Sequence, residues 1–403
     1  MRQQMRILNV VWGDYPDIRL QKTSRILGEA GHDVDVLCLA DRGSRDRFCR
    51  VIVADLPSNP LERIYRRTLA TFARSPVEFS WRHMAAFRKA LDARPGYHTV
   101  IWNDLPGALE AAKHVHERGM RFVFDMHENY ADNMWSTERD LGQRSFRYSM
   151  SAWLAYEAAA LAHCDRVLVN IEEMGERAIG MHFLAPEKIS VVRNAEPPDL
   201  WANVQPSDEL KQRFAGKFVL LFVGSSSVHR GVDTIVKAMP SVLQRYPDTV
   251  LVVVGSGNGI EGWQQTTRNL GLESAVFFEG RKPFAEAQRY YKIGHVGVIP
   301  HYKYGQTDNG IPHKFAQNLV SELPILASSC HALERIVRET GCGAVFRAGH
   351  PKDAARAIIE MRSGGQLEEM RTRALALATA GEFSWPAMAA SLIAAIDDCG
   401  PTA

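Results

Sequence analysis

The stretch of sequence that decides the fold is KFVLLFVGSSSVHRGVDTIVKAMPSVLQR, residues 217–245. It begins with a short apolar run at 217–223, passes through a loop of small polar residues, and continues into an amphipathic segment at 233–245. A buried strand, a glycine-containing loop and a helix in this order are typical of a parallel sheet that helices cover on both faces. The stretch therefore predicts an α/β domain in this part of the chain.

The same alternation of strands and helices extends over most of the chain. Before the linker, apolar runs predict strands at 6–11, 33–39, 99–102, 121–124, 166–169 and 189–192, with a helix at 17–30. After the linker, they predict strands at 217–223, 250–255, 275–278, 295–299 and 324–327, with a helix at 311–322. Residues 195–209 carry three prolines and no periodicity, which is typical of a linker. We therefore expect two consecutive open α/β domains that face each other across a cleft.

Length and composition agree with this fold class and exclude several others. The 403 residues suffice for two to three domains, and 46% hydrophobic with 23% charged residues is ordinary for a globular protein. A formal net charge of +2 argues against a nucleic-acid binder, and no apolar run reaches the ~18 residues of a membrane span. Six scattered cysteines without a C-x-x-C pair favour a reducing cytoplasm over a disulfide framework or a zinc site.

Open parallel sheets bind ligands at the carboxyl ends of their strands, so the candidate site lies in the loops that come directly after them. The strand at 217–223 is followed by Gly224-Ser225-Ser226-Ser227-Val228-His229-Arg230-Gly231. Its small residues let the backbone approach a phosphate and Arg230 adds positive charge, although an ordinary strand–helix connection is the alternative. The next loop, Gly255-Ser256-Gly257-Asn258-Gly259, allows close approach of a ligand or of another backbone segment, and a flexible connection is the alternative.

The most informative loop is Pro300-His301-Tyr302-Lys303-Tyr304-Gly305-Gln306-Thr307-Asp308-Asn309-Gly310, which runs into Ile311-Pro312-His313-Lys314. Pro312 suits the first turn of a helix, whose N-terminus directs amide groups and the positive end of the helix dipole at a ligand. Lys314 and Gln317 share a face with that end. These groups together make a cradle for a diphosphate and an adjoining ribose. A purely structural helix cap would leave the long polar loop unexplained.

Ionisable residues also follow strands of the first domain. Asp125-Met126-His127-Glu128 follows the strand at 121–124, and Asp104 follows the strand at 99–102. Ionisable groups at a strand end are costly to desolvate, which favours a function for them. His127 is a candidate acid or base. Asp125 alone could instead cap a helix, and the spacing of the three groups is not that of a preformed metal site.

In their order along the chain, these residues resemble the GT-B glycosyltransferases, in particular bacterial members of family 4. The likeness runs through Asp17-Ile18-Arg19, Gly31-His32-Asp33-Val34, Asn103-Asp104, Asp125-Met126-His127-Glu128, Val192-Arg193-Asn194, residues 224–231, Val254-Gly255-Ser256-Gly257, Phe278-Glu279-Gly280-Arg281 and residues 311–324. The resemblance implies two Rossmann-like domains, at 1–198 and 213–382, joined by a linker at 199–212. It also implies a final helix, within 383–403, that packs back on the first domain.

The resemblance implies a role for each residue that matches the family's motifs. Arg230 and Lys314 would hold the diphosphate of the donor, Gly255 and Gly257 would pass close to the nucleotide, and the main chain around Arg281 would meet the base. His127 would lie near the transferring sugar and the acceptor. The remaining donor-side positions are Gly224, Ser225, Gly231, Tyr304, Asn309 and Gln317, and the other candidate catalytic residues are Asp104, Asp125 and Glu128.

Three positions depart from the family pattern. Ser225 stands where the family usually has an arginine, and Asn309 and Gln317 stand where it usually has two glutamates. A lysine followed three residues later by glutamine is also similar to the xanthan glucuronosyltransferase type of GT-B enzyme, which inverts. An uncharged pair around the donor would suit a uronic acid, since a carboxylate there would repel it.

The resemblance implies transfer of a sugar from a UDP- or GDP-sugar to a hydroxyl of a saccharide or lipid-linked saccharide, in surface polysaccharide or glycoconjugate synthesis. We expect retention of configuration, with no metal or other cofactor. If the enzyme inverts instead, Asp125, Glu128 or Asp104 would be the base. Two further functions are compatible with the sequence: a nucleotide-sugar enzyme without transfer, such as an epimerase, and a non-catalytic binding protein.

A separate question concerns residues 61–94, where basic residues outnumber acidic ones and aromatic residues are interleaved. Such a segment would suit peripheral contact with the anionic inner face of a membrane. The alternative is a solvated helical face whose aromatic residues point into the core. We expect a cytoplasmic enzyme in either case, with no nucleic-acid partner.

Overall fold

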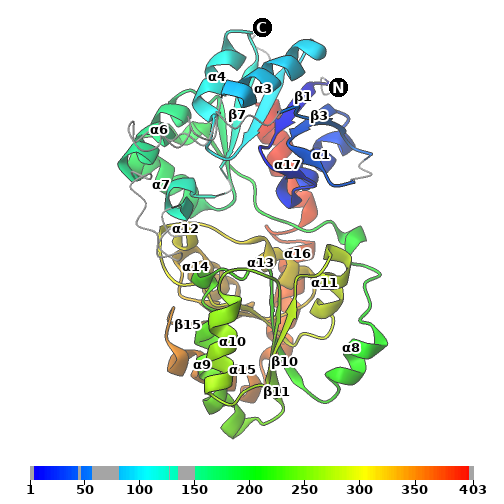
Figure 1. The fold of residues 1–403 in the computed structure, drawn as a ribbon, viewed down its shortest axis with the longest axis vertical. Coiled ribbons are helices and arrows are strands. Elements are labelled where there is room, and N and C mark those ends of the chain that lie inside the picture. Colours follow the sequence, from blue (N-terminus) through cyan, green and yellow to red (C-terminus); the bar gives the residue numbers. More distant parts are fainter. Residues whose placement is uncertain (1–3, 44–46, 57–80, 127, 135–149, 399–403) are drawn as a thin grey trace. The chain divides into compact units, whose positions relative to one another are not determined.

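The computed structural model describes residues 4–43, 47–56, 81–126, 128–134 and 150–398 (Figure 1). They form two compact units. The N-terminal unit comprises residues 1–193 together with 388–403, and the C-terminal unit comprises residues 194–387.

The N-terminal unit is built on one parallel sheet. Among the described residues its strand order is β5-β3-β1-β6-β7-β8-β9. The strands are β1 (Arg6–Val10), β3 (Asp33–Cys38), β5 (Arg50–Val53), β6 (Thr99–Asn103), β7 (Arg121–Met126), β8 (Arg166–Val169) and β9 (Ile189–Val191). Two further short strands, β2 (Asp14–Tyr15) and β4 (Ala40–Asp41), pair with each other. The strand order reverses between β1 and β6, which makes their carboxyl ends the switch point of this sheet.

Helices connect these parallel strands. They are α1 (Ile18–Glu29), α3 (Trp81–Ala93), α4 (Ala108–His116), α6 (Met150–Ala162) and α7 (Glu172–His182), with a 3-10 turn at Pro186–Lys188. The start of α1 is fixed by Asp17, whose carboxylate accepts hydrogen bonds from the amides of Arg19 and Leu20. Such a cap satisfies amides that have no partner within the helix.

The C-terminal unit has a parallel sheet of order β12-β11-β10-β13-β14-β15. Its strands are β10 (Phe218–Val223), β11 (Thr249–Val254), β12 (Val276–Gly280), β13 (Val296–Ile299), β14 (Ile325–Ser328) and β15 (Gly343–Phe346). The order reverses between β10 and β13, so the loops after these two strands flank the crevice where such sheets bind ligands.

The helices of this unit cover both faces of the sheet. They are α8 (Asp208–Arg213), α9 (Val232–Arg245), α10 (Ile260–Asn269), α11 (Phe284–Tyr291), α12 (Gly305–Asp308), α13 (His313–Val320), α14 (His331–Thr340), α15 (Pro351–Ser363) and α16 (Leu367–Thr379), with 3-10 turns at Pro198–Leu200 and Val228–Arg230. Figure 1 shows α9 beside α10 and α15, and all three belong to one packed layer. The last helix, α17 (Trp385–Asp397), belongs to the N-terminal unit from Met388 onward.

Alternate residues of β10 explain why its sequence is apolar throughout. Leu220 and Phe222 pack against Ile235 and Met239 of α9 on one face of the sheet. Leu221, on the other face, packs in a second core that includes Tyr291 of α11. A strand that is buried on both faces needs an uninterrupted apolar run, as the sequence indicates.

The predicted fold class, two parallel α/β domains, is confirmed. The structure differs from the predicted elements mainly at sheet edges and helix starts. The edge strands β5 and β15 were not predicted, and α8 begins within the stretch expected to be irregular, with Ser207 as its cap. The helix expected from residue 311 begins at His313, and Pro312 is its N-cap.

Candidate functional site

Three basic side chains gather at the switch point of the C-terminal sheet. Arg230 ends the short turn after β10, His301 follows β13, and Lys314 lies in the first turn of α13. The Arg230 Nη1 atom lies 3.4 Å from His301 Nε2, and Lys314 Nζ lies 3.7 Å from the centre of the Phe222 ring. The predicted site residues Arg230 and Lys314 thus lie close together, with a histidine that the sequence did not single out.

The side-chain amine of Lys314 is buried, and no acidic side chain among the described residues pairs with it. The residue is 8% exposed, and its Nζ has no hydrogen-bond partner among the residues that the structure describes. Burial and the charge of Arg230 hold the pKa of Lys314 well below its usual value. An unsatisfied buried donor costs free energy, so this arrangement favours a ligand that brings negative charge.

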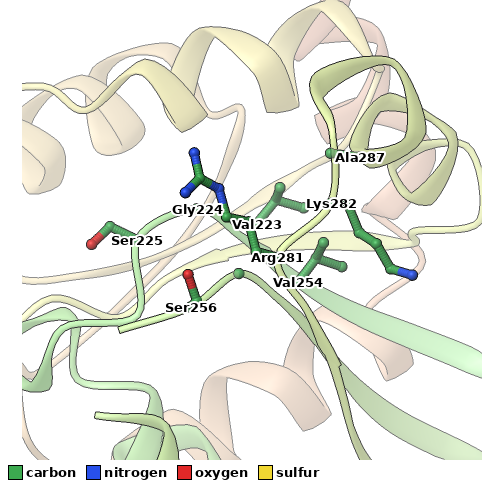
Figure 2. Close-up of a pocket in the computed structure, with 9 residues that line it drawn as sticks. Val223, Gly224, Ser225, Val254, Ser256, Arg281, Lys282 and Ala287 are labelled. Carbon is green, nitrogen blue, oxygen red and sulfur yellow. The ribbon is translucent and has the colours of Figure 1, made fainter. Parts of the chain in front are cut away.

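A cavity of about 310 Å³ lies at the carboxyl ends of β10, β11 and β12 (Figure 2). It is lined by Val223, Gly224, Ser225, Val254, Gly255, Ser256, Arg281, Lys282 and Ala287. Lys314 adjoins it, because its Cε and Nζ lie 3.3 Å from where a Cβ atom on Gly224 would be. The cavity and the basic cluster therefore meet at Gly224.

The glycines of the two loops let their backbones pack together. Gly255 has φ of 150°, and a Cβ atom there would lie 1.9 Å from the carbonyl oxygen of Gly224. A Cβ atom on Gly257 would lie 2.6 Å from the backbone of Ser226, and one on Gly231 would lie 2.1 Å from the carbonyl oxygen of Pro300. The glycine-rich loop after β11 thus closely approaches another backbone segment, as one interpretation of its sequence predicts.

We expect Gly255→Ala to lower the free energy of unfolding by at least about 2 kcal/mol, because the methyl group would meet backbone in a conformation that disfavours a side chain. The measurement is urea denaturation followed by circular dichroism. Gly262→Ala is the matched control, since its Cβ atom would enter open space within α10. A glycine-to-alanine change there should stabilise by about 0.5–1 kcal/mol. Equal stability of the two variants would contradict the expected clash.

The remaining donor-side residues are held by neighbours within the same unit. Gln317 Oε1 accepts a hydrogen bond of 2.8 Å from the hydroxyl of Tyr291, which orients the amide. Asn309 Nδ2 donates to the carbonyl oxygen of Gly305 at 3.0 Å and closes the end of α12. Tyr304 precedes α12, and its ring meets that of His229 edge to face at 5.7 Å. The hydroxyl of Ser225 lies 3.1 Å from that of Ser227.

In the N-terminal unit, the candidate residues lie at the carboxyl ends of neighbouring strands. Asp125 is fully buried, and its two oxygens accept hydrogen bonds of 3.0 and 3.1 Å from Arg19. Arg19 also donates to the carbonyl oxygen of Val192 at 2.9 Å. Glu128 accepts a hydrogen bond of 2.6 Å from Asn133. Asp104 follows β6 with φ of 68°, whereas His127 lies outside the described residues.

The basic, aromatic segment is described only from residue 81 onward. There Trp81 is 67% exposed, Phe87 is buried, and Arg94 forms ion pairs with Asp33 and Asp35. In the described part of the chain, no helix has the length and apolar character needed to cross a bilayer. Nor do three or more histidine, cysteine or acidic side chains in that part gather so as to hold a metal ion.

Several residues of this site were not predicted from the sequence. His301, Phe222 and Tyr291 each contact a predicted residue: Arg230, Lys314 and Gln317, respectively. The sequence offered one signal for His301, because a histidine that comes directly after a buried strand and a proline lies where parallel sheets bind ligands. Phe222 and Tyr291 offered none, because they fit the apolar pattern of their own elements.

Comparison with known proteins identifies the family. Residues 17–195 match the glycosyl transferase 4-like domain, and residues 205–375 match glycosyl transferases group 1. A D-inositol 3-phosphate glycosyltransferase of Acidothermus cellulolyticus is 24% identical over 390 residues, which cover 92% of this chain and 82% of the relative. Several other glycosyltransferases match over only 51–57% of their own length.

Solved structures agree on the fold. Sucrose-phosphate synthase from Thermosynechococcus elongatus superimposes with a TM-score of 0.73 at 19% identity, over 98% of this chain and 99% of that one. Anabaena HepE in complex with UDP-glucose gives a TM-score of 0.71 at 15% identity, over 98% and 100%. With both halves of the chain matched to glycosyltransferase domains and the two-sheet fold in place, the protein is a family 4-like glycosyltransferase of the GT-B fold.

Proposed function

We propose that this glycosyltransferase moves a sugar from a nucleotide diphosphate sugar to a hydroxyl of a saccharide or lipid-linked saccharide, and that Lys314 and Arg230 bind the donor's diphosphate. The observation that carries the proposal is the buried amino group of Lys314, which has no hydrogen-bond partner among the described residues. A diphosphate would supply the missing negative charge, and UDP-glucose is bound to the related fold of Anabaena HepE.

The adjoining cavity is suited to the nucleotide. Its walls combine the apolar side chains of Val223 and Val254 with glycine backbone, and Arg281 lies at its edge. The base would lie beside the main chain at Arg281, and Gln317 would meet the ribose from the far side of Lys314. Its amide can bond to hydroxyl groups either as a donor or as an acceptor.

In this proposal the reaction depends on stabilising the leaving group. As the glycosidic bond breaks, the bond's electron pair passes to the diphosphate, which gains negative charge. Lys314, Arg230 and the amides at the start of α13 would stabilise that charge as it develops. Since these groups supply the positive charge, we propose that transfer proceeds without a metal ion.

We propose retention of configuration, in which the acceptor attacks on the leaving-group side and the diphosphate takes its proton. The environment of Asp125 supports this, because both its oxygens are held by the buried guanidinium of Arg19. A carboxylate held in this way is better suited to anchoring the end of β7 than to accepting a proton. A stereochemical assay of the product by NMR tests retention directly, and an inverted product would overturn it.

A uronic acid donor is a second candidate. Asn309 and Gln317 are both neutral amides whose side chains are engaged by Gly305 and Tyr291. They add no negative charge that would repel a donor carboxylate. Competition between UDP-glucuronate and UDP-glucose in a transfer assay tests this candidate, and a preference for the neutral hexose would reject it.

A thermal-shift screen of UDP-, GDP- and ADP-sugars tests the proposed donor site. A nucleotide at 100 times its dissociation constant should add about 2.7 kcal/mol of stability. That gain should disappear in Lys314→Ala and Arg230→Ala and persist in Lys237→Ala, whose exposed ammonium pairs with Asp233. Stabilisation that survives both site variants would place the nucleotide elsewhere.

We also expect the protein to take up protons from solution when UDP binds. The pKa of Lys314 is lowered in the free site by burial and by Arg230, and a bound diphosphate would raise it again. Between these two pKa values the complex holds more protons than the free protein, so the affinity rises as the pH falls. The terminal phosphate of UDP, with a pKa of about 6, is already ionised at pH 8.

Calorimetry in buffers of different ionisation enthalpy measures this uptake. The uptake should be positive at a pH between the two pKa values of Lys314, and it should vanish in Lys314→Met. An uptake of zero in the unmodified protein would mean that Lys314 is already charged in the empty site.

A further inference from the structure

The loop after β13 contacts the turn that carries Arg230 through several of its residues. The carbonyl oxygen of Pro300 lies against Gly231, at 2.1 Å from where a Cβ atom would be. The amide of Tyr302 donates to the carbonyl oxygen of His229 at 3.0 Å. The ring of Tyr304 meets the His229 ring. The loop after β13 thus supports the turn after β10 through backbone and ring contacts.

Within the loop after β13, His301 is the residue whose side chain contacts the Arg230 guanidinium. It is 1% exposed, and its Nε2 lies 3.4 Å from Arg230 Nη1. Its carbonyl oxygen accepts a hydrogen bond of 2.7 Å from the hydroxyl of Ser328 in β14, which fixes its backbone. On the other side, the Tyr302 hydroxyl donates to Asp233 in the first turn of α9, at 2.8 and 2.7 Å from its two oxygens.

The charged groups that shift the pKa of His301 are positive. Burial, Arg230, Lys314 and His229 each lower this pKa, which lies well below the usual value. The imidazole is therefore neutral at physiological pH, and with the proton on Nδ1 its Nε2 accepts a hydrogen bond. A neutral acceptor can orient a guanidinium without cancelling its charge, whereas a carboxylate in the same place would neutralise it.

We propose that His301 is a positioning residue for the donor: its Nε2 holds the Arg230 guanidinium in the orientation that binds the diphosphate and leaves its charge available to the ligand. This inference rests on the proposed function, in which Arg230 binds the donor. In this proposal the long polar loop after β13 has a structural role, because it holds the turn after β10 in place.

The test is a double-mutant cycle on UDP affinity, measured by calorimetry at pH 8. His301→Leu should weaken binding about tenfold, since a hydrogen bond to a charged group is lost. His301→Gln should stay within about threefold of the unmodified protein, because its amide oxygen can accept from Arg230. His301→Asp should also weaken binding, because its carboxylate would hold Arg230 but neutralise it. In the Arg230→Ala background, His301→Leu should change the affinity by less than twofold.

Three outcomes would overturn the inference: unchanged affinity in His301→Leu, no rescue by His301→Gln, or an equal loss from His301→Leu with and without Arg230. Melting temperatures are measured for every variant, and if His301→Leu does not fold, the comparison of His301→Gln with His301→Asp decides by the same reasoning. If Arg230→Ala itself leaves UDP affinity unchanged, the proposed function fails at Arg230. If Arg230→Ala weakens binding and His301 acts independently of it, only this inference fails.

Discussion

Lys314→Met is expected to leave the protein folded and more stable, and yet to lower kcat/KM for sugar transfer by about 10²–10³. Methionine has nearly the shape of lysine and can lie over the Phe222 ring, where Lys314 Nζ now lies 3.7 Å from the ring centre. Removing a buried amine without a partner should recover about 1–3 kcal/mol of unfolding free energy. The same change removes a cation that would meet the departing diphosphate.

The two effects of opposite sign distinguish a binding role from a structural one. Chemical denaturation without ligand measures the stability, and initial rates over a range of donor concentrations measure kcat/KM. Lys237→Met is the matched control, since it removes an exposed ammonium of the same unit and should change neither quantity appreciably. A Lys314→Met protein that is less stable, or as active as the unmodified one, would contradict the assignment.

The fold could be predicted from the sequence wherever burial on both faces leaves a continuous apolar run. Strand β10 is an example, because Leu220 and Leu221 each face a core on opposite sides of the sheet. The edge strands β5 and β15 were not predicted, although each contains three consecutive apolar residues, at 51–53 and 344–346. Most of their residues are only partly buried, since an edge strand has a neighbour on one side alone.

The candidate site was predictable as far as it depends on the residues directly after each strand. Arg230 lies in the turn after β10, and Lys314 lies in the first turn of the helix that follows the loop after β13. Both are thus at the carboxyl ends that open parallel sheets use for ligands. That β10 lies next to β13 is a property of strand order, which local pattern does not contain. For this reason the sequence did not predict the contact between Arg230 and His301, which are 71 residues apart in the chain. The same holds for Phe222 beneath Lys314.

The glycines illustrate a different limit. The sequence left open whether the loop after β11 approaches a ligand or another backbone segment. In the structure Gly255 lies against Gly224, and Gly257 against Ser226. A sequence shows that a side chain is missing at a position, but it does not show what occupies the space.

Asp125→Ala is expected to cost about 3–5 kcal/mol of unfolding free energy, because it leaves the Arg19 guanidinium buried without its carboxylate. Both side chains are almost fully buried, at 1% and 0% exposure, and join α1 to the end of β7. Asp398→Ala is the matched control. It removes an ion pair with Arg166 at 3.4 Å in which the aspartate is 66% exposed, and such a surface pair contributes about 0–1 kcal/mol.

The double variant Arg19→Met/Asp125→Leu distinguishes the cost of losing the ion pair from the cost of leaving one charge buried without its partner. Replacing both charges with apolar groups of similar volume removes the uncompensated charge, so the double variant should be more stable than Asp125→Ala or Arg19→Met alone. Urea denaturation of the unmodified protein, Arg19→Met, Asp125→Leu and the double variant closes the cycle. If Asp125→Ala costs less than about 1 kcal/mol but abolishes transfer in folded protein, then Asp125 acts on the reaction and not on the fold. A large loss of stability that the double variant repairs means that Asp125 anchors α1 to the strand end from which the segment with Glu128 emerges.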